Sequence, residues 1–195
     1  MEDYSFIKHA WLKIKIDETY DYIKFLFNIE RKNINKNIHS SINRDLLIHS
    51  TSILEWIITY YIFEYYENCS QIQKDKFNKL LIRIEYKESN KHKDLLIKSE
   101  NKKLVLCIKK EKFSKDFSKL NFWNLISISW KLKLFEKEII NKLKEIQDIR
   151  NDLHIQKVLE DNIFLDKITD EKLFELLVFV KEIEKIIKKW CNYNK

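Results

Sequence analysis

The amino-acid sequence predicts an all-α protein, a helical bundle of about five to six helices in which the first two helices are long. The 195-residue chain contains no Gly and no Pro, and many-stranded β folds depend on these residues for their turns. Apolar residues recur at helical spacing through most of the chain, which is typical of helices with one buried face. Asn residues between the apolar segments, such as Asn33, Asn68 and Asn101, are candidates for the turns.

Two long helices are predicted in the first third of the chain. The first runs from about residue 4 to residue 29, and its spacing predicts an inward face made of Ile7, Trp11, Ile14, Tyr22, Phe25 and Leu26. The second runs from about residue 42 to residue 67 and is apolar on nearly every face in its later half. That pattern is typical of the central helix of a bundle, or of a helix that also lines a subunit interface.

The rest of the chain reads as shorter helices around polar connections. A third helix is predicted from about residue 70 to 86, followed by a polar, Lys-rich loop from 87 to 103. The segment Leu104–Ile108 fits either a short strand or a helical turn. Further helices are predicted at about 122–134, 135–154 and 169–193, the last of them beginning at Thr169, a good N-cap residue followed by two acidic residues.

The composition predicts one cytoplasmic domain, residues 1–195, because the chain has no internal repeat, no linker and no N-terminal signal segment. The longest apolar stretch is interrupted by Glu55 and Glu64, so no membrane association is expected. Cys69, Cys107 and Cys191 fit neither a disulfide framework nor a zinc site, which indicates reduced thiols in the cytosol.

The absence of Gly excludes several classes of site, because phosphate-binding loops, dinucleotide-binding turns and nucleophile elbows each need Gly where the backbone approaches a ligand. The formal net charge of +7 suits a phosphate-rich partner. It is equally consistent with a compositional bias toward Ile, Lys and Asn.

The strongest chemical signal is the run Arg150-Asn-Asp-Leu-His154 at the end of a predicted amphipathic helix. Ile139, Leu143 and Ile146 form its apolar stripe, and further steps of four reach Arg150 and then His154. A cation and an imidazole thus stand where the pattern predicts apolar side chains, with Asn151 beside them. Such departures are expected at functional sites, although an Arg and a His near a helix C-terminus often only interact with its last carbonyl groups.

This run resembles the motif of the HEPN superfamily, in which an Arg is followed by a polar residue and, a few positions later, by a His. Three residues separate Arg150 and His154 here, whereas four to six are usual, so the run is a variant of that motif. The early helices are similar as well, because HEPN proteins often carry an acidic residue in an apolar run of the second helix, and Glu55 matches it. Thr51, Ser52 and Thr59 fall on the same predicted face as Glu55.

The resemblance implies a metal-independent endoribonuclease that needs no cofactor and cleaves RNA by attack of the 2′-hydroxyl, leaving a 2′,3′-cyclic phosphate. Arg150 and His154 would be the catalytic residues, with Asn151 and Glu55 in support. HEPN domains often act in toxin–antitoxin or phage-defence systems, which implies a possible antitoxin or other regulatory partner. They also dimerise with a composite cleft, for which Trp56, Tyr60 and Phe63 could supply the interface if they are not core residues.

Three alternatives remain open from the sequence. Arg44 and His49 also form an Arg-to-His pair with four residues between them, but positions five apart diverge by about 140° around a helix. The basic run Lys109, Lys110, Lys112 and Lys115, interleaved with Phe113 and Phe117, could contact an RNA backbone or simply be a solvated face. Finally, the chain could be a non-catalytic HEPN module that binds RNA or protein, in which Arg150 and His154 stabilise the fold.

Overall fold

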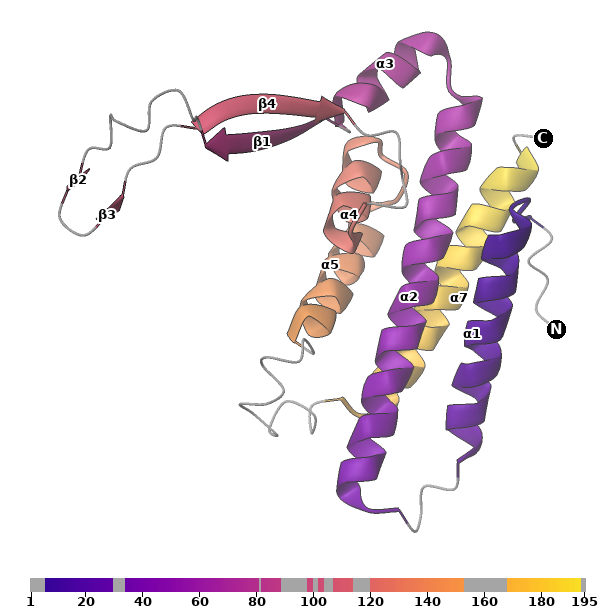
Figure 1. Ribbon diagram of the computed structural model, residues 1–195. Helices are drawn as coiled ribbons and strands as arrows, with labels where there is room; N and C mark the ends of the chain where they lie inside the picture. Colours follow the sequence, from indigo (N-terminus) through magenta and orange to yellow (C-terminus); the bar gives the residue numbers. More distant parts are fainter. Residues whose placement is uncertain are drawn as a thin grey trace. The chain divides into compact units, whose positions relative to one another are not determined.

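The computed structural model describes residues 6–29, 34–80, 82–88, 98–99, 102–103, 107–113, 120–152 and 168–193. The chain forms two compact units, one made of residues 1–68 and 120–195 and the other of residues 69–119. The described residues of the first unit are a bundle of five helices: α1 (Ala10–Asn28), α2 (Lys36–Asn68), α4 (Phe122–Lys131), α5 (Lys137–Asp152) and α7 (Asp170–Tyr193) (Figure 1). The predicted all-α bundle with two long early helices is confirmed.

Helix α2 is the centre of the bundle and contacts α1, α4, α5 and α7. Five of its apolar side chains are completely buried, namely Ile53, Leu54, Ile57, Ile58 and Ile62. Burying a side chain of this size contributes roughly 1.5–3 kcal/mol. The apolar residues on nearly every face of its later half therefore pack against helices on several sides of α2.

By length and composition α2 could also cross a membrane, with a mean hydropathy of 1.3 in its most apolar 18-residue window. In the bundle, 61% of that window is buried. The central helix of a water-soluble bundle has the same properties, so its apolar character is weak support for a membrane span.

Polar contacts fix the helices around α2. The buried Asn43 of α2 donates from Nδ2 to the carbonyl oxygen of Ile168 at 3.0 Å and to Oδ1 of Asp170 at 3.1 Å, which holds the start of α7 against α2. On the other side, the Tyr20 hydroxyl of α1 donates to the Glu184 carboxylate of α7. Lys181 donates to the same carboxylate at 3.1 Å, so this buried charge has partners from two helices.

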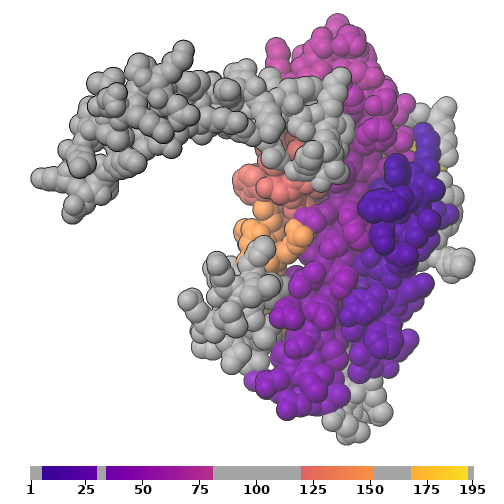
Figure 2. Space-filling view, viewed as in Figure 1, coloured from indigo at the N-terminus to yellow at the C-terminus, as the bar shows by residue number. Residues whose placement is uncertain are grey.

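The predicted inward face of α1 is largely wrong. Trp11, Ile14, Tyr22 and Phe25 are exposed, whereas Ile7 and Leu26 are buried as expected. The helix is apolar on two faces, and the face that packs on its neighbours contains Ile16, Tyr20 and Ile23. In the view of Figure 2, α1 and α2 share one surface of the first unit.

The second unit contains α3 (Gln71–Leu80), β1 (Ile82–Glu88), β2 (Lys98–Ser99), β3 (Lys102–Lys103) and β4 (Cys107–Phe113). β1 pairs antiparallel with β4, with Ile82 opposite Phe113 and Glu88 opposite Cys107, and β2 pairs with β3. The third helix predicted to residue 86 is therefore too long, because Ile82, Ile84 and Tyr86 alternate with polar residues at the period of a strand. Of the undecided segment Leu104–Ile108, the last two residues begin β4.

Candidate functional site

Arg150 and Glu55, which lie 95 positions apart in the sequence, meet in the bundle. Arg150 is in the last turn of α5, and its Nη1 donates a hydrogen bond to Oε1 of Glu55 on α2. The side chains are 32% and 20% exposed, respectively. The structure thus joins the arginine of the predicted motif to the acidic position of the second helix.

The other polar residues on this part of α2 bond within their own helix. The hydroxyls of Thr51 and Ser52 both donate to the carbonyl oxygen of Ile48 at 2.9 Å, and the Thr59 hydroxyl donates to the carbonyl of Glu55 at 2.7 Å. Such bonds satisfy a hydroxyl in an apolar setting without a partner from another helix. Glu55 is therefore the member of the predicted polar strip that reaches α5.

The environment of Glu55 shifts its proton affinity in two opposing ways. Burial raises the pKa of the carboxyl above its ordinary value of 4.5, and the charge and hydrogen bond of Arg150 lower it by a smaller amount, so that the net direction is upward. Ionising this carboxyl group therefore costs more free energy than it does in water, even with a guanidinium beside it. Its hydrogen bond uses one of the five N–H donors of Arg150.

The remaining residues of the predicted motif are only partly described. Asn151 is exposed in the last turn of α5, next to Arg150. One turn before, Gln147 is buried, and its Oε1 has no hydrogen-bond partner among the described residues. His154 lies outside the described residues. The site described here therefore consists of Arg150, Glu55 and Asn151.

Arg44 and His49, the alternative Arg-to-His pair, contact different residues although both lie on α2. The His49 ring packs edge-on against Tyr22 of α1, with ring centroids 4.7 Å apart. The Arg44 guanidinium lies beside the adjacent Asp45, with Nε 3.7 Å from Oδ1. Neither residue has a described contact with Arg150, so this pair is a suitable control for experiments on the α5 site.

The predicted basic run lies in the second unit, where Lys109, Lys110 and Lys112 belong to β4. They stand opposite Tyr86, Glu85 and Arg83 of β1. Lys115 lies outside the described residues. Contact of this run with RNA stays a prediction.

The three aromatic residues suggested for a dimer interface have different environments. Tyr60 is buried and donates its hydroxyl to the carbonyl of Phe6 at 2.8 Å, so it belongs to the core. Burial raises the pKa of Tyr60 to about 12. Trp56 is half-buried and Phe63 is exposed. Only these two could contribute to a surface for a second copy.

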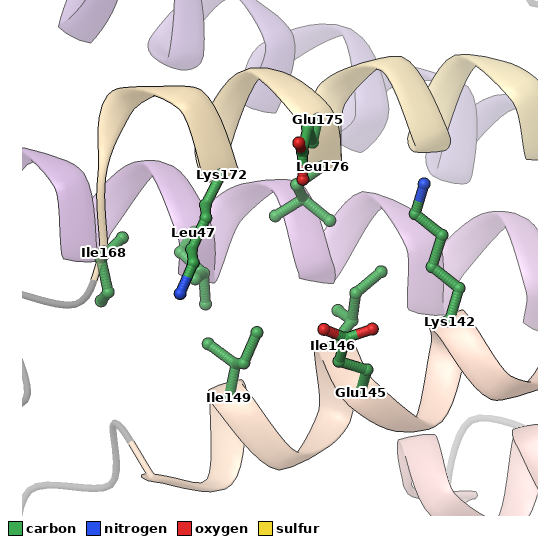
Figure 3. Close-up of a pocket in the computed structure, with 9 residues that line it drawn as sticks. All are labelled: Leu47, Lys142, Glu145, Ile146, Ile149, Ile168, Lys172, Glu175 and Leu176. Carbon is green, nitrogen blue, oxygen red and sulfur yellow. The ribbon is translucent and has the colours of Figure 1, made fainter.

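A pocket of about 260 Å³ lies between α5 and α7. Figure 3 shows its aliphatic side chains, which come from α2, α5, Ile168 and α7, and the charged Lys142, Glu145, Lys172 and Glu175 around them. The charges at its edge balance, two basic against two acidic. Arg150 and Glu55 do not line it, so this pocket and the motif residues are separate features of the bundle.

The turn between α4 and α5 forms a second hollow, which the sequence analysis did not single out. Helix α4 ends in a Schellman motif, in which Leu134 N–H donates to the Ser129 carbonyl at 2.9 Å and Lys133 N–H donates to the Trp130 carbonyl at 3.1 Å. Lys133 has a φ of 55°, the left-handed conformation that Gly usually supplies. Beside the turn is an open hollow of about 590 Å³, lined by Trp130, Lys131, Lys133, Leu134, Phe135 and Glu136.

Within the described part of the chain, no group of three or more His, Cys, Asp and Glu side chains is arranged to hold a metal ion.

Comparison with family models, with curated proteins and with solved structures finds no match to this chain. Its function is therefore argued from the site itself.

Proposed function

We propose that this protein is a metal-independent endoribonuclease of the HEPN type, with Arg150 and His154 as its catalytic residues. The observation that carries the proposal is the Arg150–Glu55 contact, because it joins the arginine of the motif to the acidic position that the HEPN resemblance matches in the second helix. A half-exposed Arg that stands on the apolar face of a helix, held by a carboxylate from another helix, is preorganised for an anionic ligand.

The chemistry required of Arg150 is stabilisation of negative charge at phosphorus. In this proposal the 2′-hydroxyl of RNA attacks the adjacent phosphorus, the bond from phosphorus to the 5′-oxygen breaks, and a 2′,3′-cyclic phosphate and a 5′-hydroxyl form. Arg150 keeps four N–H donors besides the one bonded to Glu55, and a guanidinium presents them in a fixed plane that suits a phosphate. Its role is to hold the scissile phosphate as charge accumulates on its oxygens.

The proton transfers are assigned to His154, on the basis of the motif. An imidazole has an ordinary pKa near 6.5 and can both accept and donate a proton near neutral pH, a contribution of roughly 10²–10⁴ in rate. The reaction needs one proton removed from the 2′-hydroxyl and one delivered to the 5′-oxygen. A homodimer with two facing motifs would supply both, and that pairing is part of the proposal, as are roles in toxin–antitoxin or phage-defence systems with an antitoxin or regulatory partner.

The competing proposal is a non-catalytic module, and the same ion pair gives it a specific basis. A pair between half-buried groups of α2 and α5 can stabilise the bundle without any chemistry. The two proposals differ in what His154→Ala does, because a catalytic His can be removed with little effect on the melting temperature, whereas a structural one cannot.

The test is incubation of the purified protein with mixed RNA in EDTA. Cleavage that yields 2′,3′-cyclic phosphate ends and is lost in Arg150→Ala and His154→Ala would support the ribonuclease, provided that His154→Ala keeps the wild-type melting temperature and Arg150→Ala is still folded at the assay temperature. Arg44→Ala and His49→Ala are the matched controls, since they remove the same two residue types from α2. Absence of cleavage by the wild-type protein would refute the proposal.

A further inference from the structure

Two exposed tryptophans lie on one face of α4. Trp123 and Trp130 are 52% and 49% exposed, which is unusual for such large aromatic side chains. They are seven residues apart, so they lie on the same side of the helix, about 10 Å from each other along its axis. The buried residues of α4 are Phe122, Leu125, Ile126, Ile128 and Ser129. The tryptophans are thus not needed for the core of the bundle.

The electrostatic character of this face is basic. From Leu120 to Phe135 the sequence contains no acidic residue, and it contains two lysines, Lys131 and Lys133. Both lysines line the hollow beside Trp130, together with the buried Phe135 and with Glu136. The lining of this hollow therefore includes an indole, one aromatic and one aliphatic side chain, two lysines and a single glutamate.

The geometry points to a binding site for single-stranded RNA on this face, in which one base stacks on Trp130 within the hollow and a second base stacks on Trp123. Sequence-tolerant binding of single strands relies on aromatic side chains that stack with bases, beside basic residues that follow the backbone. Lys131 and Lys133 would contact phosphates next to the base on Trp130. The inference rests on the proposed function for its choice of RNA as the ligand.

The position of α4 connects this face to the candidate site. Helices α4 and α5 pack against each other and are joined by the short turn 132–136, so they run antiparallel (Figure 1). Trp130 therefore lies toward the turn, and Trp123 lies toward the end of α5 that carries Arg150. A strand that stacks first on Trp130 and then on Trp123 would be led toward Arg150.

The test is fluorescence anisotropy with a labelled 12-nucleotide RNA carrying 2′-O-methyl groups, which blocks attack by the 2′-oxygen and isolates binding from cleavage. Stacking of one base on an aromatic side chain contributes about 1–3 kcal/mol, so Trp123→Ala and Trp130→Ala should each raise the Kd about 5- to 150-fold. Trp123→Phe and Trp130→Phe should retain most of the affinity. Lys131→Ala should weaken the dependence of binding on salt by about 0.7 in the slope of log K against log salt.

The matched control is Phe174→Ala, which removes an aromatic residue that is 66% exposed from α7. An unchanged Kd in both Trp→Ala variants, or equal losses in Phe174→Ala, would overturn the inference. It would also be overturned if the wild-type protein failed to bind the RNA, or if the Trp→Ala variants abolished self-association in place of RNA binding. Binding that depends on the tryptophans, without any cleavage of unmodified RNA, would refute only the ribonuclease. Cleavage unaffected by both tryptophan substitutions would refute only this binding site.

Discussion

Removing the Glu55 carboxylate tests whether α2 and α5 are coupled through Arg150. Breaking a fully buried ion pair by deleting one partner costs about 3–5 kcal/mol, whereas exposed pairs contribute about 0–1 kcal/mol. With 20% and 32% of the two side chains exposed, this pair lies between those limits. We expect Glu55→Ala and Arg150→Ala each to lower the free energy of unfolding by about 1–2 kcal/mol, or roughly 2–8 °C in melting temperature for a chain of this length.

The measurement is a double-mutant cycle, in which urea denaturation of each variant at pH 7 is monitored by circular dichroism. The double variant should be less destabilised than the sum of the single variants, with a coupling free energy of about 1 kcal/mol. The matched control is the pair Lys8–Glu64, 3.0 Å apart, in which Lys8 is 63% exposed. Its coupling should be smaller. Additive effects of Glu55→Ala and Arg150→Ala, within about 0.3 kcal/mol, would refute the coupling of the two helices through this pair.

Two further predictions concern stability. Since burial raises the pKa of Glu55 above 4.5, its protonated form is favoured by folding, so the stability it contributes is present below pH 4.5 and is lost as the pH rises through the raised pKa. The unfolding free energy of the wild-type protein relative to Glu55→Gln should therefore fall as the pH rises above 4.5, by at most about 1.4 kcal/mol per pH unit, and a rising difference would contradict this sign. Lys133→Gly should stabilise the protein by about 1 kcal/mol in urea denaturation, because the backbone φ at this position is 55° and Gly adopts that conformation without strain. The control Lys131→Gly lies within α4 and should destabilise the protein by a similar amount. A Lys133→Gly variant that is less stable than the wild type would refute the strain at this turn.

The bundle could be predicted from the sequence because its helices are long and strongly periodic. The later half of α2 is apolar on nearly every face, and it is the helix that contacts four others. The prediction of the buried face of α1 was largely wrong, because the sequence of a helix with two apolar faces does not indicate which of them is buried. The strand β1 was missed because a short alternating segment directly after a helix resembles a continuation of that helix.

The candidate site was predictable in part. Arg150 interrupts an apolar stripe and Glu55 matches the acidic position of the second helix in the HEPN resemblance, and the two residues meet in the bundle. Sequence could not separate Tyr60 from Phe63, because only the packing of neighbours decides which aromatic side chain is buried. The hollow beside Trp130 was also missed, although the spacing of Trp123 and Trp130 in a segment without acids is a signal that the sequence contains.

The central claim is that Arg150 and His154 cleave RNA without a metal ion, and cleavage of mixed RNA in EDTA with analysis of the product ends tests it most directly. The account predicts 2′,3′-cyclic phosphate ends from the wild-type protein. It also predicts a rate loss of about 10²–10³-fold in Arg150→Ala and about 10²–10⁴-fold in His154→Ala, while Arg44→Ala and His49→Ala retain activity. No cleavage by the wild-type protein, or losses confined to the Arg44 and His49 variants, would contradict it.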